Sequence, residues 1–319
     1  PRRPPARLAA LMVALGAALG TWLVWWAMVT TWPGQRVEER VFETADRYQD
    51  VVNHLVEPML LLGSLPWLAA GLLVVCGIGL LRRSWVATAM AAVVILGANL
   101  TTQVIKDGVF HRVGLVGEWN QDVNTLPSGH VTVVAAAWAA LLLVTPRGWR
   151  PVTALAGAAV TCAMGLATLA DRWHRPSDVV AAVLVVVAWT ALTCALAPAG
   201  WAGPPAAGTA RRATAGTARR ATAGTARRAA AGAARRADAA TGPVTILLGV
   251  IAVPAAAVSV LAAAATEGYA WATLPWGGGL TAYTGGLLAA CAVSAAAFAV
   301  LLPVCQAADR ARSGARQAG

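Results

Sequence analysis

Charge is scarce in this sequence. Only 12% of its 319 residues are Asp, Glu, Lys or Arg, which is about half the share in a soluble globular domain. Lys106 is the single lysine, and all other basic residues are arginines. Because 58% of the residues are hydrophobic and many of them lie in long uncharged runs, the composition excludes a soluble protein and indicates an integral membrane protein.

Paired cysteines and nucleic-acid motifs are also missing. The five cysteines are an odd number, lie within apolar runs and form no Cys-x-x-Cys pair, so we expect neither a disulfide framework nor a zinc site. A net charge of +11 would suit nucleic acid, but the basic residues fall between apolar runs and in one repeat. We therefore exclude nucleic acid as a partner.

Long apolar runs dominate what is present. A helix needs roughly 20 apolar residues to cross a bilayer, and eight runs qualify: residues 9–29, 59–81, 85–105, 129–145, 152–170, 178–196, 244–265 and 280–304. The first run is too long for a signal peptide and lacks a small-residue cleavage site, so we take it as a helix. The predicted fold is an all-α polytopic membrane helix bundle, with a six-helix core followed by two further transmembrane helices.

A polar stretch separates the first two runs. In residues 33–57, Val41, Ala45 and Val52 recur at helical spacing with charged residues between them. This pattern predicts an amphipathic helix that lies on the membrane surface. Residues 1–58 then hold the first transmembrane helix and this outer segment, and residues 59–196 form the membrane core.

A basic repeat follows the core. Residues 208–238 repeat Gly-Thr-Ala-Arg-Arg-Ala-Thr-Ala and contain no large apolar side chain, so they cannot bury a core of their own. Ala and Arg favour a helix whereas the recurring Gly and Thr oppose it. We predict a flexible basic cytoplasmic linker over residues 197–243, two added helices within residues 244–305 and a basic cytoplasmic tail over residues 306–319.

Loop charge predicts the orientation in the membrane. One set of loops, with both termini, carries 18 arginines and only two acids, Asp238 and Asp309. The other set carries seven basic and 12 acidic residues. Because the positive side faces the cytoplasm, both termini are expected to be cytoplasmic. Lys106, His130 and His174 then lie at the extracytoplasmic surface.

Two short motifs each place a histidine at the start of an apolar run: Thr-Leu-Pro-Ser-Gly-His at residues 125–130 and His-Arg-Pro-Ser-Asp at residues 174–178. On a helix, His174 and Asp178 share one face, and the carboxylate can fix the tautomer of the ring. A histidine held in this way can attack phosphorus, while His130 can protonate the leaving group.

Fixed donors must stabilise the charge that develops on a transferred phosphoryl group. Lys106 supplies a point charge, and Arg112 a planar fork that suits phosphate oxygens. Ser128 and Gly129 lie where a helix would begin, and the free N–H groups there favour an anion. His111 is a weaker candidate for the acid because it lies inside the Lys–Arg segment.

These motifs resemble those of the type 2 phosphatidic acid phosphatase (PAP2) superfamily of membrane lipid phosphatases: Lys-x6-Arg-Pro, Pro-Ser-Gly-His and Ser-Arg-x5-His-x3-Asp. The resemblance covers about residues 59–196, and the Ala- and Arg-rich composition is typical of an actinobacterial member. It implies that His174 is the nucleophile, Asp178 its orienting partner and His130 the general acid, with no metal or other cofactor. It assigns phosphate binding to Lys106, Arg112, Ser128 and Gly129.

The first motif departs from the family pattern. Five residues rather than six separate Lys106 from Arg112, and Val113 stands where the family has proline. A loop can absorb a difference of one residue, so we keep Arg112 as a phosphate-binding candidate.

The third motif lacks its Ser-Arg pair, whose positions hold Ala167 and Thr168. The phosphate-binding arginine of the family is therefore absent there. Arg172 follows about one helical turn later, and Arg175 adjoins His174. We expect one of them, Arg172 in the first instance, to supply the missing charge.

The resemblance and the site residues together imply an integral-membrane lipid phosphatase. It would hydrolyse a lipid phosphate or diphosphate, prenyl or phosphatidate-like, through a phosphohistidine, with a membrane lipid as substrate. Two alternatives stay open: a lipid phosphotransferase that uses the same site, and a non-enzymatic membrane protein whose site has decayed. Ion-coupled transport is disfavoured because the centres of the spans hold essentially no ionisable residues. The last two spans carry no motif and could form a scaffold or a homo-oligomer contact.

Overall fold

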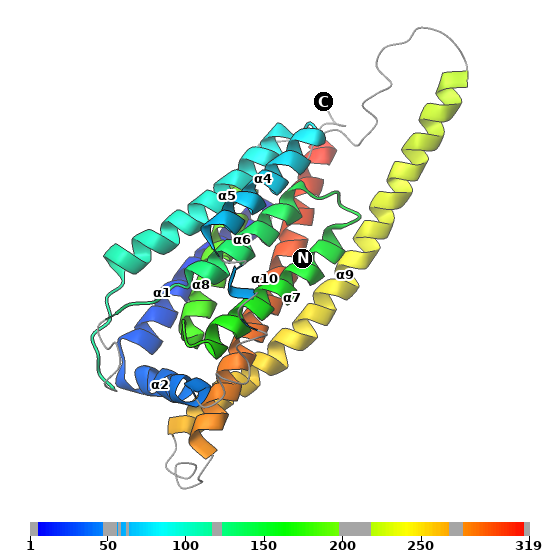
Figure 1. The fold of residues 1–319 in the computed structure, drawn as a ribbon. Helices are drawn as coiled ribbons and strands as arrows, with labels where there is room; N and C mark the ends of the chain where they lie inside the picture. The colour runs from blue at the N-terminus through cyan, green and yellow to red at the C-terminus, as the bar shows by residue number, and fades with distance from the viewer. Residues whose placement is uncertain are drawn as a thin grey trace.

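The computed structural model describes residues 6–46, 56, 59–61, 64–116, 123–197, 218–267 and 277–315. Every regular element within these residues is helical, which confirms the predicted all-α bundle (Figure 1). The helices are α1 (Ala6–Val24), α2 (Trp32–Asp46), α4 (Leu65–Leu81), α5 (Trp85–Val104), α6 (Gly129–Val144), α7 (Arg150–Ala170), α8 (Pro176–Leu196), α9 (Ala218–Glu267) and α10 (Gly277–Ala315). Helices α1 and α5 each continue into a π-helical turn, Trp25–Val29 and Ile105–Val109.

The described residues of the apolar runs that were predicted to span the membrane are helical, except for Ser64, which interrupts the run 59–81 just before α4, and Thr145, which ends the run 129–145. Six helices are long and apolar enough to cross a bilayer: Ala6–Val29, Trp85–Val109, Arg150–Ala170, Pro176–Leu196, Ala239–Thr266 and Gly279–Asp309. The other two runs contain the shorter apolar helices Ala69–Leu81 and Gly129–Val144. Helix α6 is short because Ser128 caps its start and Pro146 follows its end, since a proline cannot continue a helix.

Helix α10 packs directly on the core. It contacts α7 and α8, and small residues allow the close approach: a Cβ atom on Gly157 would lie 2.5 Å from the ring of Phe298, and one on Gly165 would lie 3.2 Å from Ala290. Small interfacial residues are the usual means by which helices pack inside a membrane. The last helix is therefore part of the bundle rather than an appendage to it.

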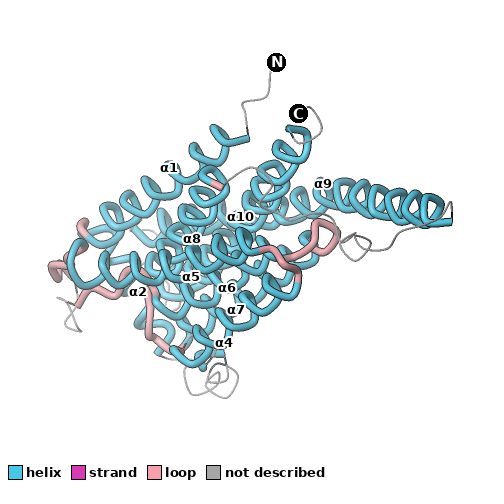
Figure 2. The backbone as a smooth tube through the Cα atoms, turned by 90° about the horizontal axis from the view of Figure 1, so that it is seen from above, coloured by secondary structure: helices cyan, strands magenta, loops and turns pink. Residues whose placement is uncertain are grey.

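Helix α9 changes the prediction made for the linker. Residues 218–243, predicted to be flexible, form the first part of this helix of 50 residues. Once a helix is nucleated, each added residue extends it at little cost, so the apolar span can propagate into the Ala- and Arg-rich repeat. Figures 1 and 2 show this part of α9 extending away from the bundle. The remaining residues of the predicted linker, 198–217, lie outside the described residues.

Helix α2 is the helix predicted for the polar stretch, and it packs on the bundle, which was not predicted. Figure 1 shows it lying across one end of the bundle, where it packs against α10 and α7. The apolar stripe is confirmed at Val41 and Ala45, whereas Val52 lies outside the described residues. Gln35 and Glu38 are also buried, at 1% and 0% exposure. Helix α2 thus covers the bundle and contributes polar groups to its interior.

Candidate active site

His174 lies in the turn between α7 and α8, where two sets of hydrogen bonds hold it. Its Nδ1 is 3.0 Å from Oδ2 of Asp178, and that oxygen also accepts the backbone N–H of Arg175 at 3.0 Å. The backbone N–H groups of Trp173 and His174 both donate to the carbonyl of Thr168, at 3.1 Å. With Nδ1 engaged by the carboxylate, Nε2 is the ring nitrogen that remains for the predicted attack on phosphorus.

The second motif is tied to the first turn of α8 through its backbone. Ser128 is the N-cap of α6, and its Oγ accepts the N–H of Val131 at 3.4 Å. Its own N–H donates to the carbonyl of Asp178 at 3.0 Å. The predicted helix start at Ser128 and Gly129 is therefore confirmed, and it lies beside the carboxylate that orients His174.

The two predicted catalytic histidines come together. The ring centroids of His130 and His174 are 6.1 Å apart, and the ring of Trp173 stands edge-on to His130 at 5.0 Å. The ammonium group of Lys106 lies near enough to act electrostatically on His130. His174 is 6% exposed and His130 is half-buried.

Asn124 holds the Lys106 turn against the second motif. Its Nδ2 donates to the carbonyl oxygens of Lys106, Phe110 and Leu126, at 3.2, 3.0 and 2.9 Å. The backbone N–H of Leu126 in turn donates to Oδ1 of Asn124 at 3.3 Å. Asn124 was not predicted from the sequence, where it is one polar residue among several in a loop.

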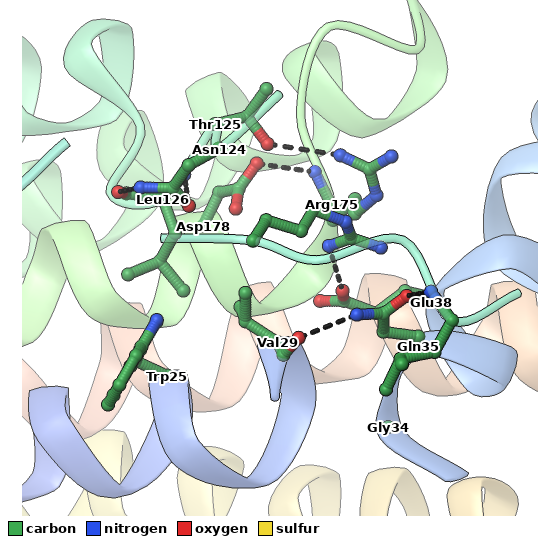
Figure 3. A network of polar contacts seen from close by, with 12 residues as sticks. Trp25, Val29, Gly34, Gln35, Glu38, Asn124, Thr125, Leu126, Arg175 and Asp178 are labelled. Carbon is green, nitrogen blue, oxygen red and sulfur yellow. Dashed lines mark hydrogen bonds and ion pairs between the residues drawn. The ribbon is translucent and has the colours of Figure 1, made fainter. Parts of the chain in front are cut away.

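Arg112 is buried, and its partner is a residue that was not predicted. Its Nη1 lies 3.3 Å from Oε2 of Glu38 on α2, and the two side chains are 4% and 0% exposed. Figure 3 shows Glu38 on the side of the site where Arg175 and Asp178 lie. Arg112, which was predicted to bind phosphate, is thus already paired with a buried carboxylate of the same chain.

Gln35, one turn before Glu38, fixes α2 to the loop that carries Arg112. Its Nε2 donates to the carbonyl oxygens of Val29 and Val113, both at 2.7 Å, and its Oε1 accepts the N–H of Leu115 at 2.8 Å. A buried amide that meets three backbone groups specifies one arrangement of these segments. The position of Glu38 is therefore set by the fold.

The electrostatics of Glu38 reflect its burial. Loss of hydration raises the pKa of this carboxyl above its ordinary value, and the negative charge of Asp178 raises the pKa further. Arg175, Arg112 and the nearby Ser177 hydroxyl act in the opposite direction on the same pKa. The proton is thus held more strongly than by a carboxyl in water.

The two arginines considered for the missing charge are placed differently. Arg172 has a left-handed φ of 58°, bonds to Asp46 and lies over the ring of Phe42 at 4.6 Å. Arg175 is 5% exposed and donates from Nη1 to Oγ1 of Thr125 at 3.2 Å. Arg175 therefore connects the two histidine motifs, while phosphate binding by Arg172 stays a prediction.

A signal for Glu38 was present in the sequence. It precedes Val41, Phe42 and Ala45 by three, four and seven residues, the spacing of one helix face. A carboxylate that is fully buried within such a stripe almost always has a charged or polar partner. Within the described residues, no group of three or more His, Cys, Asp or Glu side chains is placed to hold a metal ion.

Comparison with known families gives one match. Residues 85–201 match the family model described as the PAP2 superfamily. The matched segment runs from α5 to just beyond α8, so it holds every site residue predicted from the sequence but not Gln35 or Glu38 of α2. The comparison with curated proteins found no match, and neither did the comparison with solved structures.

Proposed function

With residues 85–201 identified as a PAP2-superfamily domain in a membrane-helix bundle, we propose that the protein hydrolyses a lipid phosphate or diphosphate, of the prenyl diphosphate or phosphatidate class. The observation that carries the proposal is the meeting of His130 and His174, with ring centroids 6.1 Å apart, while Asp178 engages Nδ1 of His174. A nucleophile and an acid that face one another suit phosphoryl transfer.

The reaction proceeds in two displacements. Nε2 of His174 attacks phosphorus and forms a P–N bond while the P–O bond to the lipid breaks, and His130 gives its proton to the departing oxygen. Water then attacks the phosphohistidine, His130 takes one proton from that water, and inorganic phosphate leaves.

Charge on the phosphoryl oxygens is stabilised by the surrounding donors. Lys106, Arg112 and the backbone N–H groups at the start of α6, beside Ser128 and Gly129, supply them. Arg175 is the better placed of the two candidates for the missing motif arginine, since it bonds to Thr125 in the second motif.

An assay with purified protein tests the reaction. Release of inorganic phosphate is measured with a prenyl diphosphate, phosphatidate and diacylglycerol diphosphate, with His174→Ala as the control. Wild type should release phosphate from at least one of these lipids and take up an acid-labile phosphoryl label that the variant lacks. A folded wild type that releases no phosphate and takes up no label from any of them would overturn the proposal. Label that passes to an added lipid alcohol instead of water would favour the phosphotransferase.

The charge distribution supports a site on the extracytoplasmic side with cytoplasmic termini. Cysteine labelling of intact cells with a membrane-impermeant maleimide tests this orientation. Glu43→Cys on the exposed side of α2 should react, and Trp149→Cys between α6 and α7, 64% exposed in the wild type, should react only after permeabilisation. The reverse pattern would place the site on the cytoplasmic side.

A further inference from the structure

Three arginines from different segments gather at the end of the bundle opposite to the two histidine motifs. Arg82 follows α4 and donates to the carbonyl of Val144, at the end of α6. Arg147 and Arg150 lie where α7 begins, and both bond to Oδ2 of Asp309 on α10, at 2.7 and 3.1 Å. Figure 1 shows α2 and the C-terminal end of α10 at opposite ends of the bundle. The whole length of α6, roughly 20 Å, therefore separates this arginine cluster from the candidate active site.

The arginine cluster carries more positive charge than its carboxylate balances. Among the described residues this end of the bundle holds one acid, Asp309. Loss of hydration lowers the pKa of Arg82 below its ordinary value, and the charge of Arg150 lowers this pKa further, while Asp309 raises it. The excess extends over the loops and termini of this side, where 18 arginines accompany only two acids. An anion beside Arg82 would relieve the repulsion between the guanidinium groups.

Two of the three arginines are accessible to such an anion. Arg82 is exposed, and the side chain of Arg147 is 24% exposed, whereas that of Arg150 is 2% exposed. A guanidinium group carries five N–H donors in a planar fork that fits phosphate oxygens. Arg82 and Arg147 can therefore contact a phosphate group, while Arg150 acts on it through its charge alone.

The apolar side chains beside the arginine cluster favour a phospholipid over a soluble phosphate. Leu81, next to Arg82, is 87% exposed, and two tryptophans at this end, Trp85 and Trp149, are 70% and 64% exposed. Exposed tryptophans at the ends of spanning helices mark the level of the lipid headgroups. Basic pockets between such helices on the cytoplasmic side bind anionic headgroups. The cluster thus lies at headgroup level, with apolar surface beside it for acyl chains.

The basic repeat starts from the same place. Gln306 on α10 is 1% exposed, and its Nε2 donates to Oγ1 of Thr241 on α9 at 3.1 Å and to the carbonyl of Arg147 at 3.5 Å. The part of α9 that precedes Thr241 contains arginine pairs at 219–220, 227–228 and 235–236. A polybasic segment next to a spanning helix attracts anionic lipids, so the repeat should enrich them around the arginine cluster.

We infer that the arginine cluster binds the headgroup of an anionic phospholipid, with Arg82 and Arg147 on its phosphate and Arg150 adding charge. Because these arginines come from the ends of α4 and α6 and the start of α7, and two of them bond to α10, the bound lipid stabilises the packing of these helices. The site is separate from the one proposed for the substrate, and the inference does not depend on the proposed function.

Thermal unfolding of the full-length protein in a neutral detergent tests the inference. Phosphatidylglycerol, which is anionic, or phosphatidylcholine, which has no net charge, is added in steps while the melting temperature is recorded. Only phosphatidylglycerol should raise it, by at least about 3 °C at saturation. Arg82→Gln and Arg147→Gln should each raise the half-saturating amount of this lipid about fivefold. Arg40→Gln, which removes an exposed arginine from the other end of the bundle, should not change it. Equal responses to the two lipids, or a wild-type half-saturation in both cluster variants, would overturn the inference.

Two further arms identify the source and the place of the anion. Glycerol phosphate at the same concentration should leave the melting temperature unchanged, and an equal rise would mean that a soluble phosphate suffices and no lipid is needed. Lys106→Gln, at the end of the histidines, should keep the wild-type response to phosphatidylglycerol. A response that is lost in Lys106→Gln but kept in Arg82→Gln would place the lipid beside the histidines and contradict a site at the arginine cluster.

Discussion

The imidazole rings of His130 and His174 lie with their centroids 6.1 Å apart and their planes inclined at 60°, although they belong to the starts of different helices. The backbone bond from Ser128 to the carbonyl of Asp178, at 3.0 Å, fixes those two starts to one another.

If His130 is the general acid, the loss of kcat that follows its removal should depend on the leaving group. His130→Ala should lower kcat on a lipid phosphate by about 10²–10⁴ but much less on p-nitrophenyl phosphate, whose phenolate leaves without a proton. His111→Ala is the matched control, because His111 is exposed. Equal losses of kcat on both substrates would contradict the role of His130.

Asp178 should act through His174 rather than on the substrate. Asp178→Asn keeps the shape of the side chain but loses the charge that favours the imidazolium, so kcat should fall by about 10³–10⁴ with little change in KM. Asp107→Asn changes an exposed acid in the π-helical turn and should leave both constants unchanged. A rise in KM at constant kcat for Asp178→Asn would show a binding role instead.

The burial of Glu38 predicts how its contribution to the stability of the folded protein changes with pH. Its pKa in the folded protein is raised above the ordinary value of 4.5, so the folded state holds this proton after the unfolded state has released it. The contribution to stability therefore falls as the pH rises from 4.5 through the raised pKa. Melting temperatures of wild type and Glu38→Gln between pH 4 and 8 isolate this effect, and wild type should lose stability relative to the variant as the pH rises. A difference that grows in the opposite direction would mean that the ion pair with Arg112 outweighs burial.

The C-terminal helix should be necessary for stability. Asp309 on α10 bonds to Arg147 at 2.7 Å and to Arg150 at 3.1 Å, and Arg150 is only 2% exposed. Asp309→Ala should destabilise the bundle by about 3–5 kcal/mol, because it leaves a buried guanidinium without its carboxylate. Glu43→Gln disrupts the exposed pair with Arg40 and should change stability little. Similar melting temperatures for the two variants would argue against the conclusion that α10 is a packed part of the bundle.

The packing of α10 on α7 can be measured chemically. The Sγ atoms of Cys162 and Cys291 are 3.1 Å apart, so treatment with a thiol oxidant such as diamide should join them. Trypsin, which cleaves after the arginines of the repeat, then yields two fragments that stay together on a non-reducing gel. Cys194 and Cys305 also lie close, with their Sγ atoms 3.7 Å apart, and would join the same two fragments. The test therefore uses a Cys194→Ser background, in which Cys162→Ser should abolish the link and Cys76→Ser should not. Separate fragments after oxidation of wild type would mean that the two helices are not in contact.

Local signals in the sequence explain what could be predicted. An apolar run becomes a helix in a membrane because its backbone groups have no other partner there. Ser128 as N-cap and Pro176 at the first position of α8 start helices for reasons contained within a few residues. The two histidine motifs lie at these starts, so their approach could be inferred from chain order and loop charge.

The burial of Glu38 has a local signal, but its pairing with Arg112 could not be predicted in this way, because the two residues are distant in the chain. The two residues meet because α2 packs closely on α10. At this contact a Cβ atom on Gly286 would lie 2.9 Å from Pro176 and 3.4 Å from Val41. A close approach of this kind depends on the shapes of several helices at once. No local pattern encodes it.

The sequence by itself determined the apolar helices, the order of the motifs and the prediction that two histidines and an acid share one site, because these depend on neighbours along the chain. Only the tertiary structure decided that a helix outside the matched segment pairs a carboxylate with Arg112, the arginine predicted to bind phosphate, and that Arg175 rather than Arg172 bonds to the second motif. Those contacts join segments far apart in the chain, and packing in three dimensions selects them.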